Sequence, residues 1–283
     1  MSERGTTDQV AVYIDFDNIV MSRYDELHGR HSYRNDDANR DGPAADVAAK
    51  LKAAEVNLAA IIDYAASFGT VSVARAYADW STPVNKSYAT ATMEKSIDLV
   101  QMFPLAGTKN GADIRLAIDV IDDLSRYSYL SHVLIVAGDS DYVSLAQRCK
   151  RLGRTVIGVG ATGSISRYWR AACDEFRNYD QLPGLAPPPA ARKAAATKKT
   201  AAKKTAAKAT AGGDSETKQR KEGDGEVDSR DAPEINASSD LLRRAMTYAL
   251  EKSTDGWTNA SGLKSLMKRL DPAFDEKLEG HKT

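Results

Sequence analysis

The sequence predicts an α/β domain with a central parallel sheet and helices on both faces, followed by a disordered linker and a small helical module. Three observations lead to this fold class. Apolar runs typical of strands alternate with amphipathic helical patterns over residues 8–182. A low-complexity stretch fills residues 183–238. A helical pattern then returns over residues 239–283.

The alternating pattern of the first part predicts five strands and three long helices. The strands are expected at 10–14, 71–78, 99–105, 132–137 and 155–160. The helices are expected at 45–68, 113–126 and 140–151. Such alternation implies parallel strands joined by right-handed crossovers. The polar stretch 22–42 is predicted to be an exposed loop, in which His28 and His31 are solvated rather than bound to zinc.

Composition limits the class of protein. A hydrophobic content of 42% is enough to build a buried core in part of the chain. No window approaches 18 uninterrupted apolar residues, and the N-terminus lacks the apolar core of a signal peptide. We therefore predict a cytoplasmic protein with no membrane role. Cys149 and Cys173 are far apart, so we expect two largely buried thiols and neither a disulfide nor a zinc ribbon.

The charge of the chain is segregated. The whole sequence has 39 basic and 39 acidic residues. The tract 190–210 holds seven basic residues and no acid, so subtracting these seven cations from a net charge of zero leaves the remainder at −7. Such a Lys/Ala-rich tract predicts salt-dependent binding to RNA or DNA with little sequence preference, or else a solubilising linker. As a flexible coil of about 52 residues, the linker would span roughly 40 Å and position the last module without docking it.

The last segment carries two amphipathic helical stripes. The first is formed by Leu241, Leu242, Ala245, Tyr248 and Ala249, and the second by Leu263, Leu266, Met267 and Leu270. Two short helices joined by a turn resemble the front of a helix-turn-helix. A module of 45 residues is short for a free-standing core, so we expect it to be minimal or incomplete.

Acidic side chains gather where strands end or helices begin. The three clusters are Asp15 to Asn18, then Asp113 with Asp119, and finally Asp139, Ser140 and Asp141. Because ligands of open parallel sheets collect at the C-terminal ends of the strands, these acids are expected to meet at one edge. Oxygen donors without histidine suit Mg²⁺ or Mn²⁺. Taken singly, each acid also fits a helix cap or a surface position.

The same blocks resemble two families. "YIDFDN" with a later "GDSD" is similar to haloacid-dehalogenase-type phosphatases, although Asn18 and Ile19 stand where those enzymes usually have Gly and Thr. The better match is the NYN domain, a branch of the PIN-like metal-dependent ribonucleases. "VYIDFDNI", "KNGADIRLAIDVI" and "VAGDSDYVSLAQRCKRLGRTVIGVG" look like its three blocks in the right order, and the likeness extends over residues 8–182.

The NYN resemblance implies roles for individual residues. Asp15, Asp113 and Asp139 are expected to bind the metal ion, and these three with Asp141 are the catalytic candidates. Asp119 and Asp141 are weaker metal candidates. In the same family, Asn18 and Ser140 would orient ligands or water. Residues 239–283 resemble a LOTUS domain, also called OST-HTH, whose next helix and wing strands would lie after Thr283.

Basic and aromatic residues near the acids are candidate RNA contacts. Lys109 and Arg115 flank Asp113 and would bind phosphate. Tyr77 and Trp80 would stack on bases, although core packing is the commoner fate of such rings. The sequence therefore predicts a ribonuclease that uses Mg²⁺ or Mn²⁺ to activate water for attack on phosphorus. The alternatives are a silent RNA- or protein-binding adaptor and, less favoured, a phosphatase. The RNA substrate, the general base and the oligomeric state stay undetermined.

Overall fold

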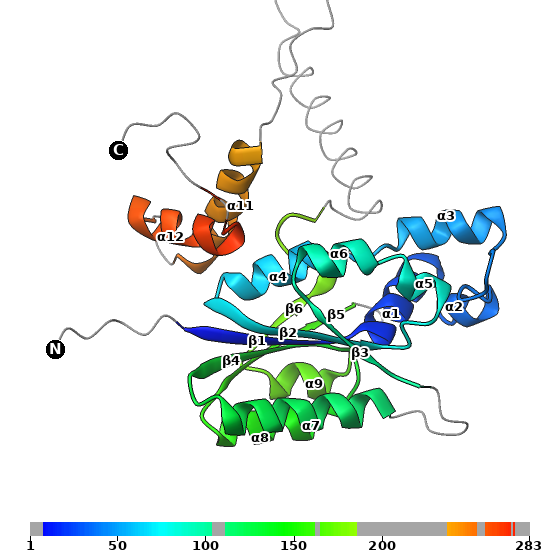
Figure 1. Cartoon of the computed structure of the whole chain (residues 1–283), viewed down its shortest axis with the longest axis horizontal. Coiled ribbons are helices and arrows are strands. Elements are labelled where there is room, and N and C mark those ends of the chain that lie inside the picture. Colours follow the sequence, from blue (N-terminus) through cyan, green and yellow to red (C-terminus); the bar gives the residue numbers. More distant parts are fainter. Residues whose placement is uncertain are drawn as a thin grey trace, which may run out of the picture. The chain divides into compact units, whose positions relative to one another are not determined.

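A computed structural model describes residues 8–103, 111–161, 165–185, 237–253, 258–272 and 274. Its centre is one six-stranded sheet in which all neighbouring strands are parallel (Figure 1). The strands are β1 (Gln9–Asp15), β2 (Thr70–Ala78), β3 (Asp98–Gln101), β4 (Leu130–Val136), β5 (Thr155–Gly160) and β6 (Glu175–Asn178). Their order across the sheet is β3-β2-β1-β4-β5-β6. The predicted parallel α/β fold is therefore confirmed.

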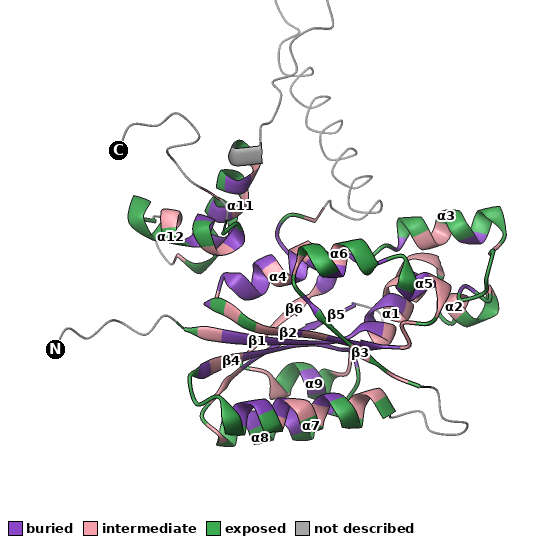
Figure 2. Cartoon of the chain, viewed as in Figure 1, coloured by how far each residue is buried: buried purple, intermediate pink, exposed green. Residues whose placement is uncertain are grey.

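Helices cover both faces of this sheet (Figure 1). One face packs against α7 (Gly111–Arg126), α8 (Tyr142–Arg151) and α9 (Arg167–Ala172). The other face packs against α1 (Phe16–His28), α4 (Leu58–Ala66), α5 (Pro83–Lys86) and α6 (Ala89–Glu94). The remaining elements are α2 (Ser32–Asn35), α3 (Ala45–Ala53) and the 3-10 turn η1 (Tyr179–Gln181). Buried residues are concentrated between the sheet and the two helical layers (Figure 2).

Strand β1 lies at the centre because its side chains are buried on both sides. Residues 10–14 are completely buried, and they divide between the two apolar clusters: Val10, Val12 and Ile14 in one, Ala11 and Tyr13 in the other. Alternate side chains of a strand point to opposite faces, so a strand covered by helices on both sides reads as a continuous apolar run. This run places Asp15 at the C-terminal edge of the sheet.

The long helix expected at 45–68 is two helices. Helix α3 ends at Ala53 and α4 starts at Leu58, with Asn57 accepting a hydrogen bond from the backbone N–H of Ala60 at 3.1 Å. The backbone N–H groups of Val56 and Asn57 donate hydrogen bonds to the hydroxyls of Tyr88 and Tyr179, respectively. Asparagine competes for backbone groups within helices and favours the N-cap, so the break follows from Asn57.

The segment 22–42 is also more ordered than an exposed loop. Helix α1 continues to His28, and α2 follows within the same segment. The carboxylate of Asp25 accepts hydrogen bonds from the backbone N–H groups of His31 and Tyr33, both at 2.8 Å. Completely buried Tyr24 donates to Asp36 at 2.7 Å. These contacts explain why the polar composition of the segment does not make it an extended loop.

Two further details differ from the expected elements. Strand β6 was not predicted, because its four residues, EFRN, are mostly polar. The third strand ends at Gln101, and residues 104 and 105 lie outside the described residues. Of the two thiols, Cys149 is buried and Cys173 is half-buried. No helix in the described part of the chain is long and apolar enough to cross a membrane.

The C-terminal segment forms α11 (Ala237–Lys252) and α12 (Ala260–Leu270). Their predicted stripes are largely buried, as Leu241, Ala245, Tyr248, Leu266, Met267 and Leu270 show, whereas Leu242 is 40% exposed. The buried residues belong to the same apolar cluster as Leu58 and Ile61 of α4. Residues up to 185 and residues from 241 onward form one compact unit. The expectation of a linked but undocked module therefore does not hold in this structure.

Polar contacts reinforce the packing of α11. Arg244 forms an ion pair with Asp63 of α4, whose side chain is only 6% exposed. Lys252 donates from Nζ to the carbonyl of Ser67 at 2.8 Å and lies 3.5 Å from the centre of the Phe68 ring. Burial is the main reason why the pKa of Lys252 falls to about 8. The linker tract 190–210 lies outside the described residues.

We expect Arg244→Met to lower the free energy of unfolding of the full chain by about 2 kcal/mol, because it leaves a buried carboxylate without its main cation. Lys268→Met, at an exposed position of α12, removes the same charge and should change it by less than about 0.5 kcal/mol. Urea unfolding followed by circular dichroism measures both. Equal effects of the two substitutions would contradict a stabilising role of the Arg244–Asp63 pair.

Candidate metal centre

The candidate site lies where the order of the sheet reverses. Strand β1 sends its first crossover to β2 on one side, and β4 pairs with β1 on the other side. Open parallel sheets bind ligands at such a point, beyond the C-terminal ends of the strands. Asp15 is the last residue of β1, and Asp139 follows β4 by three residues. The topology therefore brings the first and third acidic clusters to neighbouring strand ends.

Asp15 is held by the start of α1. Its side chain is 4% exposed, and its Oδ1 accepts a hydrogen bond from the backbone N–H of Asn18 at 3.3 Å. This is an N-cap contact, which the positive end of the helix dipole favours. Asn18 in turn accepts, through Oδ1, a hydrogen bond from the backbone N–H of Gly138 at 3.2 Å. The side chain of Asn18 thus ties the end of β1 to the loop after β4.

A tyrosine hydroxyl joins Asp15 to Asp113. The Tyr142 hydroxyl lies 2.9 Å from Oδ2 of Asp15 and 2.8 Å from Oδ1 of Asp113. Tyr142 is the first residue of α8, and Asp113 is in the first turn of α7. Three elements therefore meet at one hydroxyl. The structure brings the predicted ligands Asp15 and Asp113 together through a residue that was not predicted.

Asp15 is out of water and lies near a second carboxylate of like charge, that of half-buried Asp113. Burial, followed by the negative charge of Asp113, raises the pKa of Asp15 to about 8. Burial also raises the pKa of Asp139, and the charges of Asp113 and Asp141 add to that effect. Nearby like charges and desolvation both disfavour the ionised carboxyl. Asp15 therefore needs a cation or a proton near neutral pH.

The residues of the third cluster are exposed. Asp139, Ser140 and Asp141 are all solvent-accessible at the start of α8. Asp141 occupies the N-cap position of α8, but its side chain makes no capping hydrogen bond. Asp139 is close enough to Asp113 and Asp141 for their negative charges to contribute to its raised pKa. The orienting role that the family resemblance implied for Ser140 stays a prediction.

Asp119 has a different environment from Asp113. It accepts a hydrogen bond from the Tyr77 hydroxyl at 3.0 Å and pairs with Arg115 at 3.0 Å. The Tyr77 ring is completely buried, so it presents no face to a base in this structure. Arg115 keeps 55% of its side chain exposed and is therefore accessible to a phosphate. Lys109 lies outside the described residues.

Trp80 is packed within the protein on one side. Its ring stacks on Phe16 with centroids 4.9 Å apart, and its Nε1 donates to the carbonyl of Val100 at 3.1 Å. The side chain is half-buried. Base stacking by Trp80 therefore stays a prediction that applies only to the part of the ring not covered by Phe16.

Asp17, the second acid of the first cluster, points away from the pair. It accepts hydrogen bonds from the backbone N–H of Asp79 at 3.1 Å and from Nδ2 of Asn85 at 2.7 Å. Asn85 is buried and also donates to the carbonyl of Asp79 at 2.9 Å. Asp17 thus fixes the loop after β2 to α5. In these contacts Asp17 has a structural role. The pattern Asp15-Phe16-Asp17 is therefore explained without Asp17 as a second metal ligand.

The donor set suits a hard divalent cation. The carboxylates of Asp15 and Asp113 supply oxygen ligands that Mg²⁺ and Mn²⁺ prefer. Among the described residues, the hydrogen bonds of Asp15 come from the neutral Asn18 N–H and Tyr142 hydroxyl, so an ion would supply the positive charge that this buried carboxylate needs. Within the described ranges, no three His, Cys, Asp or Glu side chains are already arranged around one point. The pair therefore fits an ion, and Asp139 would have to turn inward to complete three ligands.

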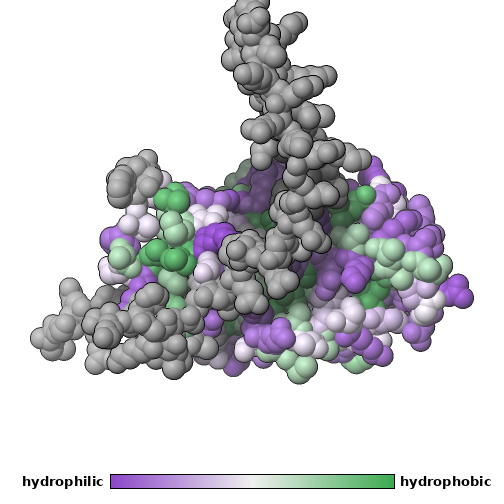
Figure 3. All heavy atoms as spheres, turned by 90° about the horizontal axis from the view of Figure 1, so that it is seen from above, coloured by the Kyte–Doolittle hydropathy of each residue, from purple (hydrophilic) through white to green (hydrophobic). Residues whose placement is uncertain are grey.

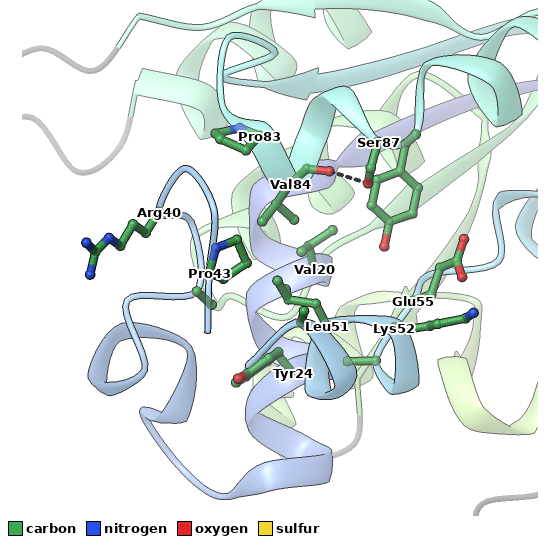
Figure 4. A pocket seen from close by; sticks show the side chains of 14 residues that line it. Val20, Tyr24, Arg40, Pro43, Leu51, Lys52, Glu55, Pro83, Val84 and Ser87 are labelled. Atoms are coloured by element: carbon green, nitrogen blue, oxygen red, sulfur yellow. Dashed lines mark hydrogen bonds between the residues drawn. The ribbon is translucent and has the colours of Figure 1, made fainter. Parts of the chain in front are cut away.

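A cavity lies apart from these acids. It has a volume of about 360 Å³ and is lined mainly by apolar side chains of α1, α3 and α5. In Figure 4, Val20 and Tyr24 of α1 face Leu51 of α3, while the Arg40 side chain extends away from them. The Tyr24 hydroxyl is already bonded to Asp36. Viewed from above, polar side chains dominate the rim of the molecule at the end of α2 and α3 (Figure 3). Because it contains none of the predicted site residues, this cavity is not the candidate metal centre.

Sequence reasoning missed Tyr142 and Asn85. Tyr142 stands directly after Asp139 and Asp141, so a polar aromatic residue at a helix start among acids was a usable signal. No comparable signal marks Asn85, which contacts Asp17 from 68 residues away.

The chain is similar to known proteins at the level of a family and of one solved structure. A family model described as "NYN domain" matches residues 9–180. No curated protein matches the chain. Among solved structures, the chain is similar to a protein of unknown function from Vibrio parahaemolyticus RIMD 2210633, with 16% sequence identity and a TM-score of 0.47. That similarity covers 64% of this chain and 98% of the other.

The raised pKa of Asp15 predicts how stability depends on pH without metal. The folded protein keeps a proton up to about pH 8, while the unfolded chain loses it near 3.8. Because the folded state then binds more protons, stability falls as the pH rises through this window. We expect Asp15→Asn to remove this loss, gaining ~3 kcal/mol relative to wild type between pH 5 and pH 8. Urea unfolding in chelator tests it, and parallel pH profiles of the two proteins would contradict it.

Proposed function

Because the chain belongs to the NYN domain family, which is a PIN-like nuclease family, we propose that it is a ribonuclease that depends on Mg²⁺ or Mn²⁺. The observation that carries this proposal is the pair formed by buried Asp15 and half-buried Asp113 at one hydroxyl, next to Asp139 at the sheet edge. The reaction would be hydrolysis of an RNA phosphodiester bond.

Each acid has a role in this proposal. Asp15 and Asp113 would hold the ion, and Asp139 would be the third ligand. Asp141 is accessible at the same edge and remains the weaker candidate. A divalent ion, when bound, would stabilise negative charge on phosphate oxygens and lower the pKa of a water molecule. Asn18 would keep the loop after β4 in place through its contact with Gly138. Asp119 would position Arg115 rather than bind the ion.

Hydrolysis of a phosphodiester adds a water oxygen to phosphorus and breaks the bond to one ester oxygen. The chain must therefore bind a negatively charged phosphate, although the chain outside the tract 190–210 is itself net negative. Basic side chains near the acids are needed to offset the repulsion. Arg115 is the described cation closest in sequence to Asp113, and its link to Asp119 fixes its guanidinium beside the acids of α7. We propose that Arg115 contacts the RNA backbone, together with Lys109.

A second candidate function is RNA or protein binding without cleavage. It is favoured by the Tyr142 hydroxyl, which already occupies one oxygen of each carboxylate of the pair. In that case the acids would be held for stability of the fold, and the domain would serve as an adaptor.

The C-terminal helices extend the proposal. We propose that α11 and α12 are the front of a LOTUS-like module, as their sequence resemblance implies. Two amphipathic helices at the predicted positions support this. Their packing on α4 supports a module that belongs to the domain rather than one held at a distance.

Cleavage of labelled single-stranded and structured RNA by the full chain tests the function. With Mn²⁺ or Mg²⁺ we expect cutting that chelator abolishes, and that Asp15→Asn or Asp139→Asn reduces by at least about 100-fold, because metal charge on the phosphate is lost. Asp122→Asn, an exposed acid of α7 paired with Arg126, is the matched control and should keep normal activity. Bound RNA that folded, metal-supplied protein does not cut would favour the adaptor.

RNA affinity tests the role of Arg115. In the Asp139→Asn background, Arg115→Ala should weaken RNA binding several-fold and reduce the salt dependence by about one phosphate contact. Arg126→Ala is the matched control, because Arg126 also pairs with an acid one helical turn away in α7, Asp122, but lies at the other end of the helix. Fluorescence anisotropy at several salt concentrations measures both. Equal weakening would indicate a general charge effect and no specific contact.

A further inference from the structure

Tyr142 is fixed in place by the packing of its ring. The ring is almost completely buried and lies 5.9 Å from the ring of Trp169, which is also buried. Trp169 donates from Nε1 to the carbonyl of Ala137 at 2.9 Å, immediately after β4. The phenol is therefore held from behind by α9 and by the end of β4. Its hydroxyl has little freedom to leave the acids.

The hydroxyl has a single proton for two carboxyl groups. It contacts Asp15 at 2.9 Å and Asp113 at 2.8 Å, but a phenol donates one hydrogen bond and otherwise accepts. Without metal, the second contact requires a proton on one of the acids or a shared hydrogen bond. Once both acids bind an ion, the phenol can donate to either of them. The Tyr142 hydroxyl can therefore bond to the acids both with and without the ion, and it keeps one oxygen of Asp15 near one oxygen of Asp113.

The ring and the hydroxyl can be separated chemically. Phenylalanine would fill the same space against Trp169, since the two side chains differ only by the oxygen. It would leave Asp15 with the hydrogen bond from the Asn18 N–H, and it would remove the hydroxyl that lies between two like charges. Mutual repulsion would then move the carboxylates apart. The oxygen atom, and not the aromatic ring, distinguishes this position.

We propose that Tyr142 is a positioning residue that orients Asp15 and Asp113 for a divalent ion through its one hydroxyl. This rests on the proposed function, because it assigns the ion to the same pair of acids. Partners that orient metal ligands typically change metal affinity 10- to 100-fold when they are removed. Tyr142 would act without touching the RNA.

The test is a titration of the full chain with Mn²⁺, in which electron paramagnetic resonance measures the free ion. We expect Tyr142→Phe to weaken Mn²⁺ binding by about 10- to 100-fold. Tyr24→Phe is the matched control, because Tyr24 is also a completely buried tyrosine whose hydroxyl donates to a carboxylate, that of Asp36 at 2.7 Å. It should change the affinity by less than about twofold. Both variants lose one hydroxyl, so a general loss of packing would affect them alike.

The outcomes separate this proposal from the proposed function. Unchanged Mn²⁺ affinity in Tyr142→Phe, with binding that Asp15→Asn still abolishes, would overturn the role of Tyr142 and leave the metal site intact. Binding in wild type that Asp15→Asn does not reduce would overturn both. If Tyr142→Phe does not fold, the proposal is tested by the ultraviolet difference spectrum between the wild type with Mg²⁺ and the wild type without it. A tyrosine signal that also appears in Tyr24→Phe supports the proposal, and the absence of a tyrosine signal overturns it.

Discussion

The structure depends on a carboxylate that is buried at the end of the central strand. Asp15 continues an apolar run whose side chains fill both faces of the sheet, and it is carried inward by that run. A charge in such a place is costly unless it is paired or protonated. The Asn18 N–H and the Tyr142 hydroxyl offset part of this cost by hydrogen bonding to Asp15. The raised pKa of Asp15 expresses the same cost as a preference for the protonated form. The acid is destabilising by itself and therefore marks the place where a cation is needed.

The sheet topology brings other acids close to the buried Asp15. Because neighbouring strands of the centre are parallel, the segments after β1 and β4 emerge at the same edge. Helix α7 then directs Asp113 toward the same point from the layer below, where Leu116 and Val120 anchor it in the core. Rigid elements, and not long loops, therefore hold the buried part of the site. Asp139 is in an exposed turn, which suits a ligand that must adjust when an ion arrives.

How much was predictable depends on whether a pattern is local. Five strands, the parallel class and the convergence of Asp15 with Asp113 followed from apolar runs and from the acids beside them. Strand β6 was missed because a short polar strand at a sheet edge does not show the alternation of apolar and polar residues by which strands are recognised. The break before Asn57 was missed because apolar spacing continues across it, although Asn57 is a good cap. Contacts such as Tyr77 with Asp119 join residues 42 apart, and no property of either residue alone reveals them.

The packing of α11 on α4 places the residues on both sides of the cationic tract in one compact unit. Residues 185 and 241 belong to that unit, so the segment between them is attached to one body at both ends. In the proposed function, RNA bound by residues 190–210 would therefore be held on the same chain as the acids, and such tethering gives effective concentrations in the millimolar range. Tethering of this kind favours repeated encounters between the acids and one bound molecule over exchange with other molecules.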